Sequence, residues 1–265
     1  MAKVHTRSNQ VVTKNKRIAV IPDVQLRPGD DVEFLNYIGQ YLCKIRPDII
    51  VCLGDFADMP SLSTHDKPGA KGFEGARYKK DVAIAQEGMA TLLAPINQLS
   101  RKIKWNPEKI MLYGNHEHRI ERAVYNDPKL EGLMGFEDLE YEKYGWTTHK
   151  FLKPVVIEGI AFCHYFVSGV MGRPCTTAQS LITKHHMSCI AGHQQGRMIA
   201  YAKSADGGEI TSIIAGSCYE HDEPYLNPQT NNHWRGLYIL NDVKDGSYDE
   251  MPVSLKYLRK KYGIK

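Results

Sequence analysis

Apolar runs that end abruptly in short polar motifs constrain this chain more than any other feature of its sequence. Residues 110–113 (Ile-Met-Leu-Tyr) are typical of a buried strand, and residues 114–117 (Gly-Asn-His-Glu) follow at once. Strand ends in α/β proteins collect ligand chemistry because backbone and side chains converge there on a crevice. The Asn amide oxygen is a hard, neutral metal ligand, and the adjacent His can carry a proton. Four further stretches of the same kind give this motif its weight.

The first half of the chain alternates strand and helix signals. Residues 17–22 and 49–53 are strand-like apolar runs, and residues 31–46 between them carry a helical stripe of apolar side chains. A strand, helix and strand in this order predict parallel pairing with a right-handed crossover. A longer helix is expected over residues 78–103, with Gly88 and Pro95 as candidate interruptions, before the strand at 109–113.

The second half favours short strands and hairpins. Residues 147–152, 155–157 and 160–163 are expected to be antiparallel neighbours, and two later hairpins are expected around the turns at 206–208 and 245–247. The sequence therefore predicts an α/β fold: a two-sheet β-sandwich flanked by helices, with a βαβαβ core and an antiparallel second half. Residues 1–16 are expected to form a basic flexible arm, and residues 17–265 a single domain.

Composition limits the functional classes without choosing among them. The 265 residues, 42% of them hydrophobic, are enough for one sizeable core. A net charge of +4 is too small to establish nucleic-acid binding, but it is compatible with an anionic substrate. The six cysteines form no C-x-x-C pair, which favours reduced thiols and a cytoplasmic location. No apolar run approaches the ~20 residues of a membrane helix, so no membrane association is expected.

Five polar stretches follow strand-like runs and share oxygen and imidazole donors. They are residues 23–25 (Asp-Val-Gln), 54–58 (Gly-Asp-Phe-Ala-Asp), 114–117, His164 and 192–195 (Gly-His-Gln-Gln). Oxygen combined with imidazole suits Mn²⁺, Fe or Mg²⁺ better than a structural thiolate zinc site would. Two such metals held ~4 Å apart can clamp a phosphate and activate a water, provided that one carboxylate bridges them.

The order and spacing of these five stretches resemble the calcineurin-like metallophosphoesterase family. Its signature is Asp-x-His, Gly-Asp-x-x-Asp, Gly-Asn-His-Asp/Glu, a lone His and Gly-His-x-His; residues 54–58 and 114–117 match in full. The loop sequences at 22–29 and 53–63 also resemble phage-encoded members. The resemblance implies a binuclear metal centre and hydrolysis of phosphate esters by a hydroxide that bridges the two metals.

The resemblance further implies a role for each matching position. Seven side chains would ligate the metals: Asp23, Gln25, Asp55, Asn115, His164, His193 and Gln195. Asp55 would bridge both ions. Asn115 and the two His residues would complete one site, while Asp23 and the two Gln residues would form the other. His116 would protonate the leaving oxygen or stabilise the phosphoryl charge, and Asp58 would orient it.

The two departures from the signature fall on the same metal site. Gln25 and Gln195 stand where the family has His, and a Gln oxygen binds borderline metals less well than imidazole does. The two changes look like a matched pair. The centre is therefore expected to favour Mn²⁺, with Mg²⁺ or Fe also compatible and Zn²⁺ less suited to the Gln-containing site. For each Gln, a solvated loop residue is about as good an interpretation as a ligand.

Substrate contacts are harder to identify. Arg173 and His221 are the best individual candidates among several basic and aromatic loop residues, although surface charge or loop packing is the better explanation for any one of them. Either His118 or Arg119 could touch the substrate phosphate, and a solvated helix face is an equally good interpretation. Glu117 is expected to support the ligands rather than bind metal. The two adjacent His residues at 185 and 186 fall on different helix faces and are expected to be structural.

The leading hypothesis is a metal-dependent phosphodiesterase acting on a phosphate ester, with a nucleotide or nucleic acid as one substrate class. A DNA or RNA nuclease of the same family is the first alternative, because the same core serves many substrates and loops choose among them. A non-enzymatic scaffold that keeps the fold is the second alternative. A phage-encoded chain would act in the host cytoplasm.

Overall fold

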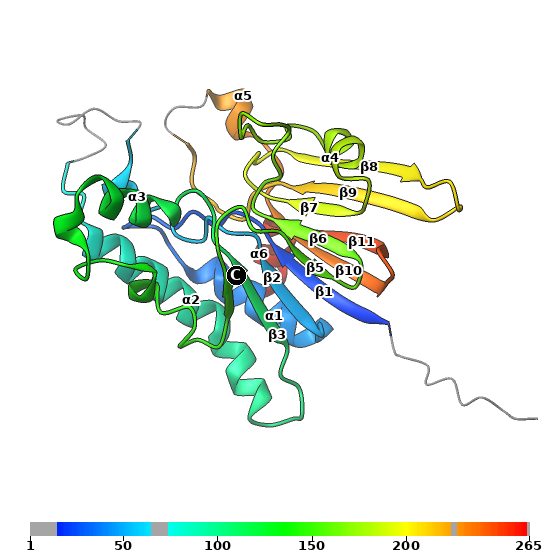
Figure 1. The fold of residues 1–265 in the computed structure, drawn as a ribbon. Helices are drawn as coiled ribbons and strands as arrows, with labels where there is room; N and C mark the ends of the chain where they lie inside the picture. The colour runs from blue at the N-terminus through cyan, green and yellow to red at the C-terminus, as the bar shows by residue number, and fades with distance from the viewer. Residues whose placement is uncertain (1–14, 65–73, 224–226, 264–265) are drawn as a thin grey trace, which may run out of the picture.

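The computed structural model describes residues 15–64, 74–223 and 227–263 (Figure 1). The expected basic arm at 1–16 therefore lies almost wholly outside the described residues. Two sheets face each other, and helices cover their outer faces, which confirms the predicted two-sheet α/β architecture. None of the helices in the described ranges is long and apolar enough to cross a membrane.

The larger sheet has six strands in the order β11-β10-β1-β2-β3-β4. Its parallel part consists of β1 (Lys16–Ile21), β2 (Ile49–Cys52), β3 (Glu108–Leu112) and β4 (Thr147–His149). Two antiparallel strands extend it beyond β1, namely β10 (Gly236–Lys244) and β11 (Ser247–Ser254). Continuous apolar runs form β1 and β2 because both faces of these strands are covered.

The smaller sheet has five strands in the order β5-β6-β7-β9-β8. They are β5 (Val155–Ile157), β6 (Ile160–Cys163), β7 (Cys189–Ala191), β8 (Arg197–Lys203) and β9 (Glu209–Ala215). The hairpins β5–β6 and β8–β9 are antiparallel, but β7 pairs in parallel with both β6 and β9. The expected antiparallel second half is therefore a mixed sheet, because helix α4 (Ala178–His185) returns the chain between β6 and β7.

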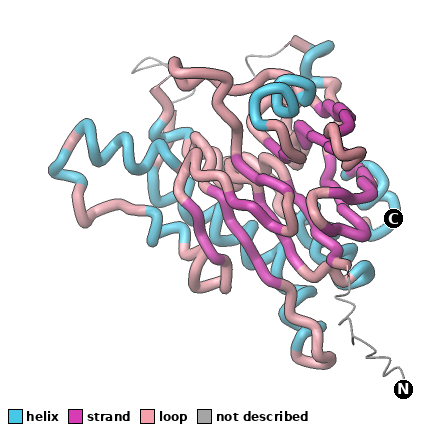
Figure 2. Tube along the Cα trace, turned by 45° about the vertical axis from the view of Figure 1, so that its right-hand side comes forward, coloured by secondary structure: helices cyan, strands magenta, loops and turns pink. Residues whose placement is uncertain are grey.

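Alternating side chains along the strands build separate core layers. Ile18 and Val20 of β1 face the second sheet, where they pack with residues such as Phe162 and Ile213. Ala19 and its alternating neighbours face the helices α1 (Glu33–Ile45), α2 (Tyr78–Ser100) and α6 (Leu255–Tyr262). On the far side, α4 covers the outer face of the second sheet (Figures 1 and 2). The fold therefore has four layers, in the order helix, sheet, sheet and helix.

Helix α2 runs through both residues that the sequence singles out as candidate interruptions. A Cβ on Gly88 would lie 2.2 Å from Cδ1 of Leu26, so this glycine serves close packing rather than a break. Pro95 lies in the last part of the helix, against Gly39 of α1. Two short helices complete the fold near the strand ends, α3 (His118–Asn126) and α5 (Pro228–Asn231).

Candidate metal centre and active site

Parallel strands of the two sheets, namely β1, β2, β3, β6 and β7, deliver the sequence-predicted residues to one edge of the sandwich. The last paired residues of β1, β2 and β3 lie level, since Ile21 pairs with Cys52 and Cys52 pairs with Met111. In the second sheet, Cys163 pairs with Ala191, so β6 and β7 also end together. Since parallel strands place their carboxyl ends on the same side, the polar motifs that follow these strands converge.

Three predicted ligands gather around the Asn115 amide oxygen. His164 Nε2 and His193 Nδ1 each lie 2.8 Å from Asn115 Oδ1, and Asp55 Oδ2 lies 3.2 Å from His164 Nε2. One ligand atom from each of Asp55, His164 and His193 lies within 4.8 Å of the others. Buried Asp55 Oδ2 accepts no hydrogen bond from any described residue, in spite of the nearby imidazole. A divalent cation would satisfy this oxygen, so the donor set fits a metal.

His164 is oriented from behind by the backbone. Its Nδ1 lies 2.9 Å from the Leu53 carbonyl oxygen, so the neutral ring donates there and presents the Nε2 lone pair to Asp55. Burial lowers the pKa of His164, but the negative charge of nearby Asp55 outweighs burial and raises this pKa to about 9. A metal at this position would need the neutral ring, so metal binding would compete with protonation of His164 Nε2.

Asp23 supplies a second carboxylate close to the first group. Both of its oxygens lie 3.0 Å from the His193 backbone nitrogen, which donates to them, and its side chain is fully buried. Burial and the charge of Asp55 raise the pKa of Asp23 to about 7, with His164 partly offsetting them. Because the buried carboxylates of Asp23 and Asp55 repel each other, a cation bound between them would stabilise the charged form of both.

Gln25 and Gln195 lie side by side. Gln195 Nε2 is 3.4 Å from Gln25 Oε1, and the Tyr219 hydroxyl donates to Gln195 Oε1 at 3.1 Å. Their contact agrees with the interpretation that the two departures from the family signature are a matched pair. Each amide oxygen accepts one hydrogen bond and keeps a second lone pair with which it could ligate a metal.

His116 and Asp58 form the acid pair next to the cluster. Asp58 Oδ1 is hydrogen-bonded to His116 Nδ1, while His116 Nε2 lies 3.7 Å from Asp55 Oδ2 and faces the predicted ligands. Burial lowers the pKa of His116, but the charges of Asp55 and Asp58 outweigh it and raise this pKa. His116 Nε2 also lies 3.3 Å from Arg119 Nη2, so the ring is held between Asp58 and Arg119 beside the predicted ligands.

Strained backbone conformations occur in the same loops, as they do at several turns elsewhere in the described residues. Gln25, Asp55, Met59, His193 and Gln195 all adopt positive φ angles between 47° and 66°. Side chains other than Gly avoid this region, and such outliers cluster at functional sites where the surroundings hold them. Close approach adds a second constraint, because a Cβ on Gly114 would lie 2.0 Å from Asp55 Oδ1.

The two predicted substrate contacts lie in different settings. Arg173 has an exposed side chain on the turn after β6, where its carbonyl oxygen accepts the Ser168 backbone N–H at 2.8 Å. His221 is partly buried and lies 3.3 Å from Asp30 and 3.4 Å from Glu223, with its ring stacked on Tyr219. Their contacts with substrate stay predictions.

The remaining His candidates contact neighbouring side chains of the protein. His118 stacks on Phe151 and pairs with Glu121, and His185 packs against Phe166. Arg119 turns inward and donates to the Asp58 carbonyl oxygen at 2.8 Å.

Sequence reasoning missed two charged residues beside the acid pair. Arg27 donates to Asp58 Oδ2 and to both oxygens of Glu223, which is 1% exposed. Arg27 could have been predicted from the sequence, because it lies two residues after the predicted ligand Gln25. Nothing near Glu223 in the sequence points to this contact, because 196 positions separate it from Arg27.

Comparisons with known proteins agree with this geometry. The model of the Calcineurin-like phosphoesterase family matches residues 16–202. The Gene 54 protein of Mycobacterium phage D29 is 28% identical over 251 residues, covering 88% of this chain and 91% of that protein. This similarity agrees with the resemblance to phage-encoded members.

Solved structures of low sequence identity also align along most of the chain. Yfce, a phosphoesterase from E. coli, aligns with a TM-score of 0.38 at 14% identity, covering 90% of this chain and 99% of that one. A conserved uncharacterized protein from Streptococcus pneumoniae aligns with a TM-score of 0.33 at 10% identity, covering 91% and 99%. The family model spans most of the described strands and every predicted metal ligand from Asp23 to Gln195, and the chain belongs to the calcineurin-like phosphoesterase family.

Proposed function

We propose that this phosphoesterase hydrolyses phosphodiesters at a centre of two divalent metal ions. The observation that carries the proposal is the unsatisfied Asp55 Oδ2, which faces His164 on one side and His116 on the other. Asn115, His164 and His193 would complete one site with Asp55, and Asp23, Gln25 and Gln195 would form the other. Metals bound there would neutralise the phosphoryl oxygens and lower the pKa of a coordinated water.

The side chains of the chain itself would position the ester and manage the proton. His116 Nε2 would donate its proton to the departing oxygen, since an alkoxide leaves poorly without one. Asp58 accepts the hydrogen bond of His116 Nδ1, which fixes the ring so that Nε2 faces Asp55. Asp55 also accepts the His116 backbone N–H at 2.8 Å, which links the backbone of His116 directly to this predicted ligand.

The charge balance of the site favours a diester over a monoester. The two cationic side chains that contact the acid pair, Arg27 and Arg119, are already paired with Asp58. Neither adds free positive charge for a phosphate. A diester carries one negative charge on the phosphoryl group, whereas a monoester carries up to two and needs more compensation.

Activity measurements on a matched substrate set test this function. The purified chain is loaded with Mn²⁺ and assayed on bis(para-nitrophenyl) phosphate, para-nitrophenyl phosphate, a dinucleotide, and single-stranded and duplex DNA. We expect turnover of the diesters above that of the monoester. Cleavage of DNA with little turnover of the small diesters would replace this proposal with a nuclease. No hydrolysis of any ester, unchanged by His116→Ala, would identify a scaffold.

A further inference from the structure

Arg27 connects the acid pair to a segment near the other end of the chain. Its Nε donates to Asp58 Oδ2, and its Nη2 lies 2.7 Å from both carboxylate oxygens of Glu223. The other Asp58 oxygen accepts the hydrogen bond of His116. Charged contacts therefore run without interruption from the His116 ring to Glu223, which is almost fully buried.

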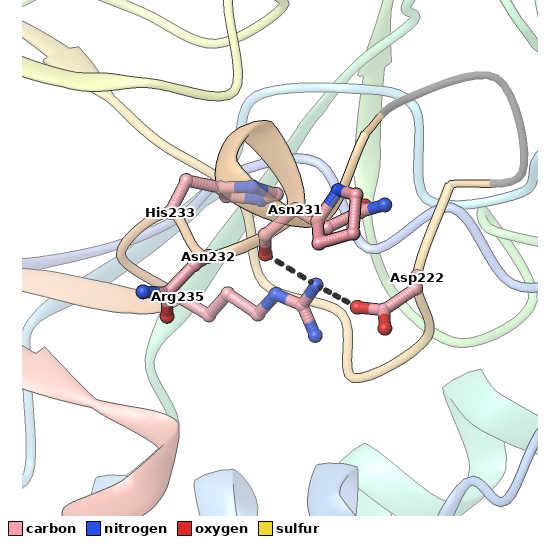
Figure 3. A pocket seen from close by; sticks show the side chains of 6 residues that line it. Asp222, Asn231, Asn232, His233 and Arg235 are labelled. Carbon is pink, nitrogen blue, oxygen red and sulfur yellow. Dashed lines mark hydrogen bonds and ion pairs between the residues drawn. The ribbon is translucent and has the colours of Figure 1, made fainter.

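Glu223 is itself fixed by the segment that precedes β10. The Asn231 side chain accepts the Glu223 backbone N–H at 2.8 Å and donates to the Glu223 carbonyl oxygen at 3.0 Å. Arg235 donates to the Glu220 carbonyl oxygen at 2.8 Å. It also donates to Asp222 Oδ1 at 2.8 Å (Figure 3). The Asn231 amide and the Arg235 guanidinium thus hold residues 220–223 in the conformation in which Glu223 contacts Arg27.

The pocket that these residues surround is a by-product of this arrangement. It measures about 460 Å³ and is lined by residues that include Asn231, His233 and Arg235 (Figure 3). Both His233 ring nitrogens have partners, Ser217 Oγ and the Thr230 carbonyl oxygen, whereas Arg235 Nε is buried with no hydrogen-bond partner among the described residues. The lining thus supplies hydrogen bonds that hold the loop in place.

His221 provides the second partner of Glu223. Its Nε2 lies 3.4 Å from Glu223 Oε1, and its Nδ1 lies 3.3 Å from Asp30 Oδ2. Asp30 Oδ2 also accepts the Arg27 backbone N–H at 2.9 Å. Glu223 thus holds the side chain of Arg27, and Asp30 holds its backbone. His221 contacts both of these carboxylates.

We propose that Arg27 is a positioning residue for the acid pair and that Glu223 is its anchor. Held by Glu223, the guanidinium fixes the Asp58 carboxylate so that its other oxygen keeps the His116 ring turned toward the reacting phosphate. A paired guanidinium also keeps Asp58 from swinging away, because its planar fork restrains the carboxylate more than a point charge would. This inference rests on the proposed hydrolytic function.

Leaving-group dependence separates this role from a merely structural one. Turnover of the Mn²⁺-loaded full chain is measured for bis(para-nitrophenyl) phosphate, whose leaving group is a stable anion, and for a dinucleotide, whose alkoxide needs a proton. Arg27→Met should lower kcat on the dinucleotide about tenfold to hundredfold and change KM little. The fall on the nitrophenyl ester should be smaller, and Arg27→Lys should restore only part of the loss.

A double variant and a matched control complete the design. Glu223→Gln should lower kcat less than Arg27→Met, and the combination Arg27→Met with Glu223→Gln should equal Arg27→Met alone, because the anchor acts through the guanidinium. The combination also removes both charges, so neither is left unpaired in the fold. Arg259→Met breaks another Arg–Glu pair of the same segment, with Glu220, and should leave kcat unchanged.

Each remaining outcome counts against a specific claim. A raised KM with unchanged kcat would make Arg27 a substrate ligand, and a parallel loss of bound metal would make it part of the metal centre; either overturns the positioning role. Equal losses on both esters, or none, would do the same. An unsubstituted chain that hydrolyses neither ester would refute the proposed function itself and the positioning role with it.

Discussion

Glu117 accepts the backbone N–H of Asp55 at 2.9 Å from a fully buried carboxylate. The same carboxylate accepts the N–H groups of Phe56, Ala57 and Gly114, at 2.7, 3.0 and 2.9 Å. One side chain thereby joins the loop after β2 to the loop after β3. The structure agrees with the interpretation that Glu117 supports the ligands rather than binding metal.

Replacing Glu117 with Gln should destabilise the chain. The amide would place an NH₂ group against backbone donors, so at least one buried N–H would lose its acceptor. We expect a loss of about 1–3 kcal/mol in the free energy of unfolding, measured by urea denaturation. Glu121→Gln, at an exposed site one turn along, should stay within about 0.5 kcal/mol of the unsubstituted chain. Equal losses would contradict the bridging role of Glu117.

Substitutions at the adjacent residues Asn115 and His116 should affect metal binding and proton donation separately. Asn115→Ala should abolish activity together with bound metal, because the amide oxygen lies at the centre of the first group. His116→Ala should retain metal while kcat falls by about a hundredfold or more. Metal content by elemental analysis, measured beside turnover, checks both. Matching metal losses in the two variants would refute this division.

The Asp58 carboxylate should make stability depend on pH in the acid range. Burial alone would raise its pKa, but His116, Arg27 and Arg119 outweigh burial and lower it from 3.8 to about 2. A carboxylate with a depressed folded pKa stabilises above its unfolded pKa, and this contribution is lost as pH falls through the folded value.

The contribution of Asp58 amounts to about 2 kcal/mol. The gap in unfolding free energy between the unsubstituted chain and Asp58→Asn should therefore be larger at about pH 6 than at about pH 2 by that amount. Denaturant unfolding at the two pH values measures it. A gap that does not change with pH would show that Asp58 gains nothing from its ionic partners.

The paired Gln residues should set the metal preference. Mn²⁺ should activate hydrolysis more than Zn²⁺, since amide oxygens hold a hard cation better than a borderline one. Changing both positions together, Gln25→His with Gln195→His, should raise zinc affinity, as followed by competition with a chelator. Zinc that already matches manganese in the unsubstituted chain would remove the basis for this expectation.

Gly114 should tolerate no side chain. A Cβ there would lie 2.4 Å from the Asp55 backbone nitrogen as well as on its carboxylate, so Gly114→Ala must displace the loop. We expect loss of metal binding and a cost of about 1–3 kcal/mol in stability. Gly169→Ala, where a Cβ would meet nothing within 4 Å, is the matched control. Normal metal content in Gly114→Ala would show that Asp55 is not held as described.

Local sequence patterns predict the strand ends and the residues that gather there. Apolar runs such as residues 110–113 are buried because of their own composition, and parallel pairing then brings their ends together. Gly88 shows the limit of local reasoning. As a helix-weakening residue it suggests a break, whereas the structure uses its missing Cβ for contact with Leu26.

Contacts between side chains that are far apart in the chain cannot be predicted from the local patterns of one sequence. Arg27 and Glu223 meet only because β10 returns to pair with β1, and neither residue carries a local signature of the other. The parallel pairing of β7 with β6 was missed for a related reason. Short strands carry too few residues for their periodicity to fix a direction, and the connecting helix decides it.

Asp23 lies near the beginning of the chain, yet its backbone is held by residues translated close to the end. Its carbonyl oxygen accepts the Cys218 N–H at 2.7 Å, and β1 has β10 as its antiparallel neighbour. A nascent chain that has not yet released β10 from the ribosome lacks both contacts, although strands β1 to β3 are already synthesised. If Asp23 binds a metal as proposed, uptake is expected only after β10 has paired with β1, so it would report on a late step of folding.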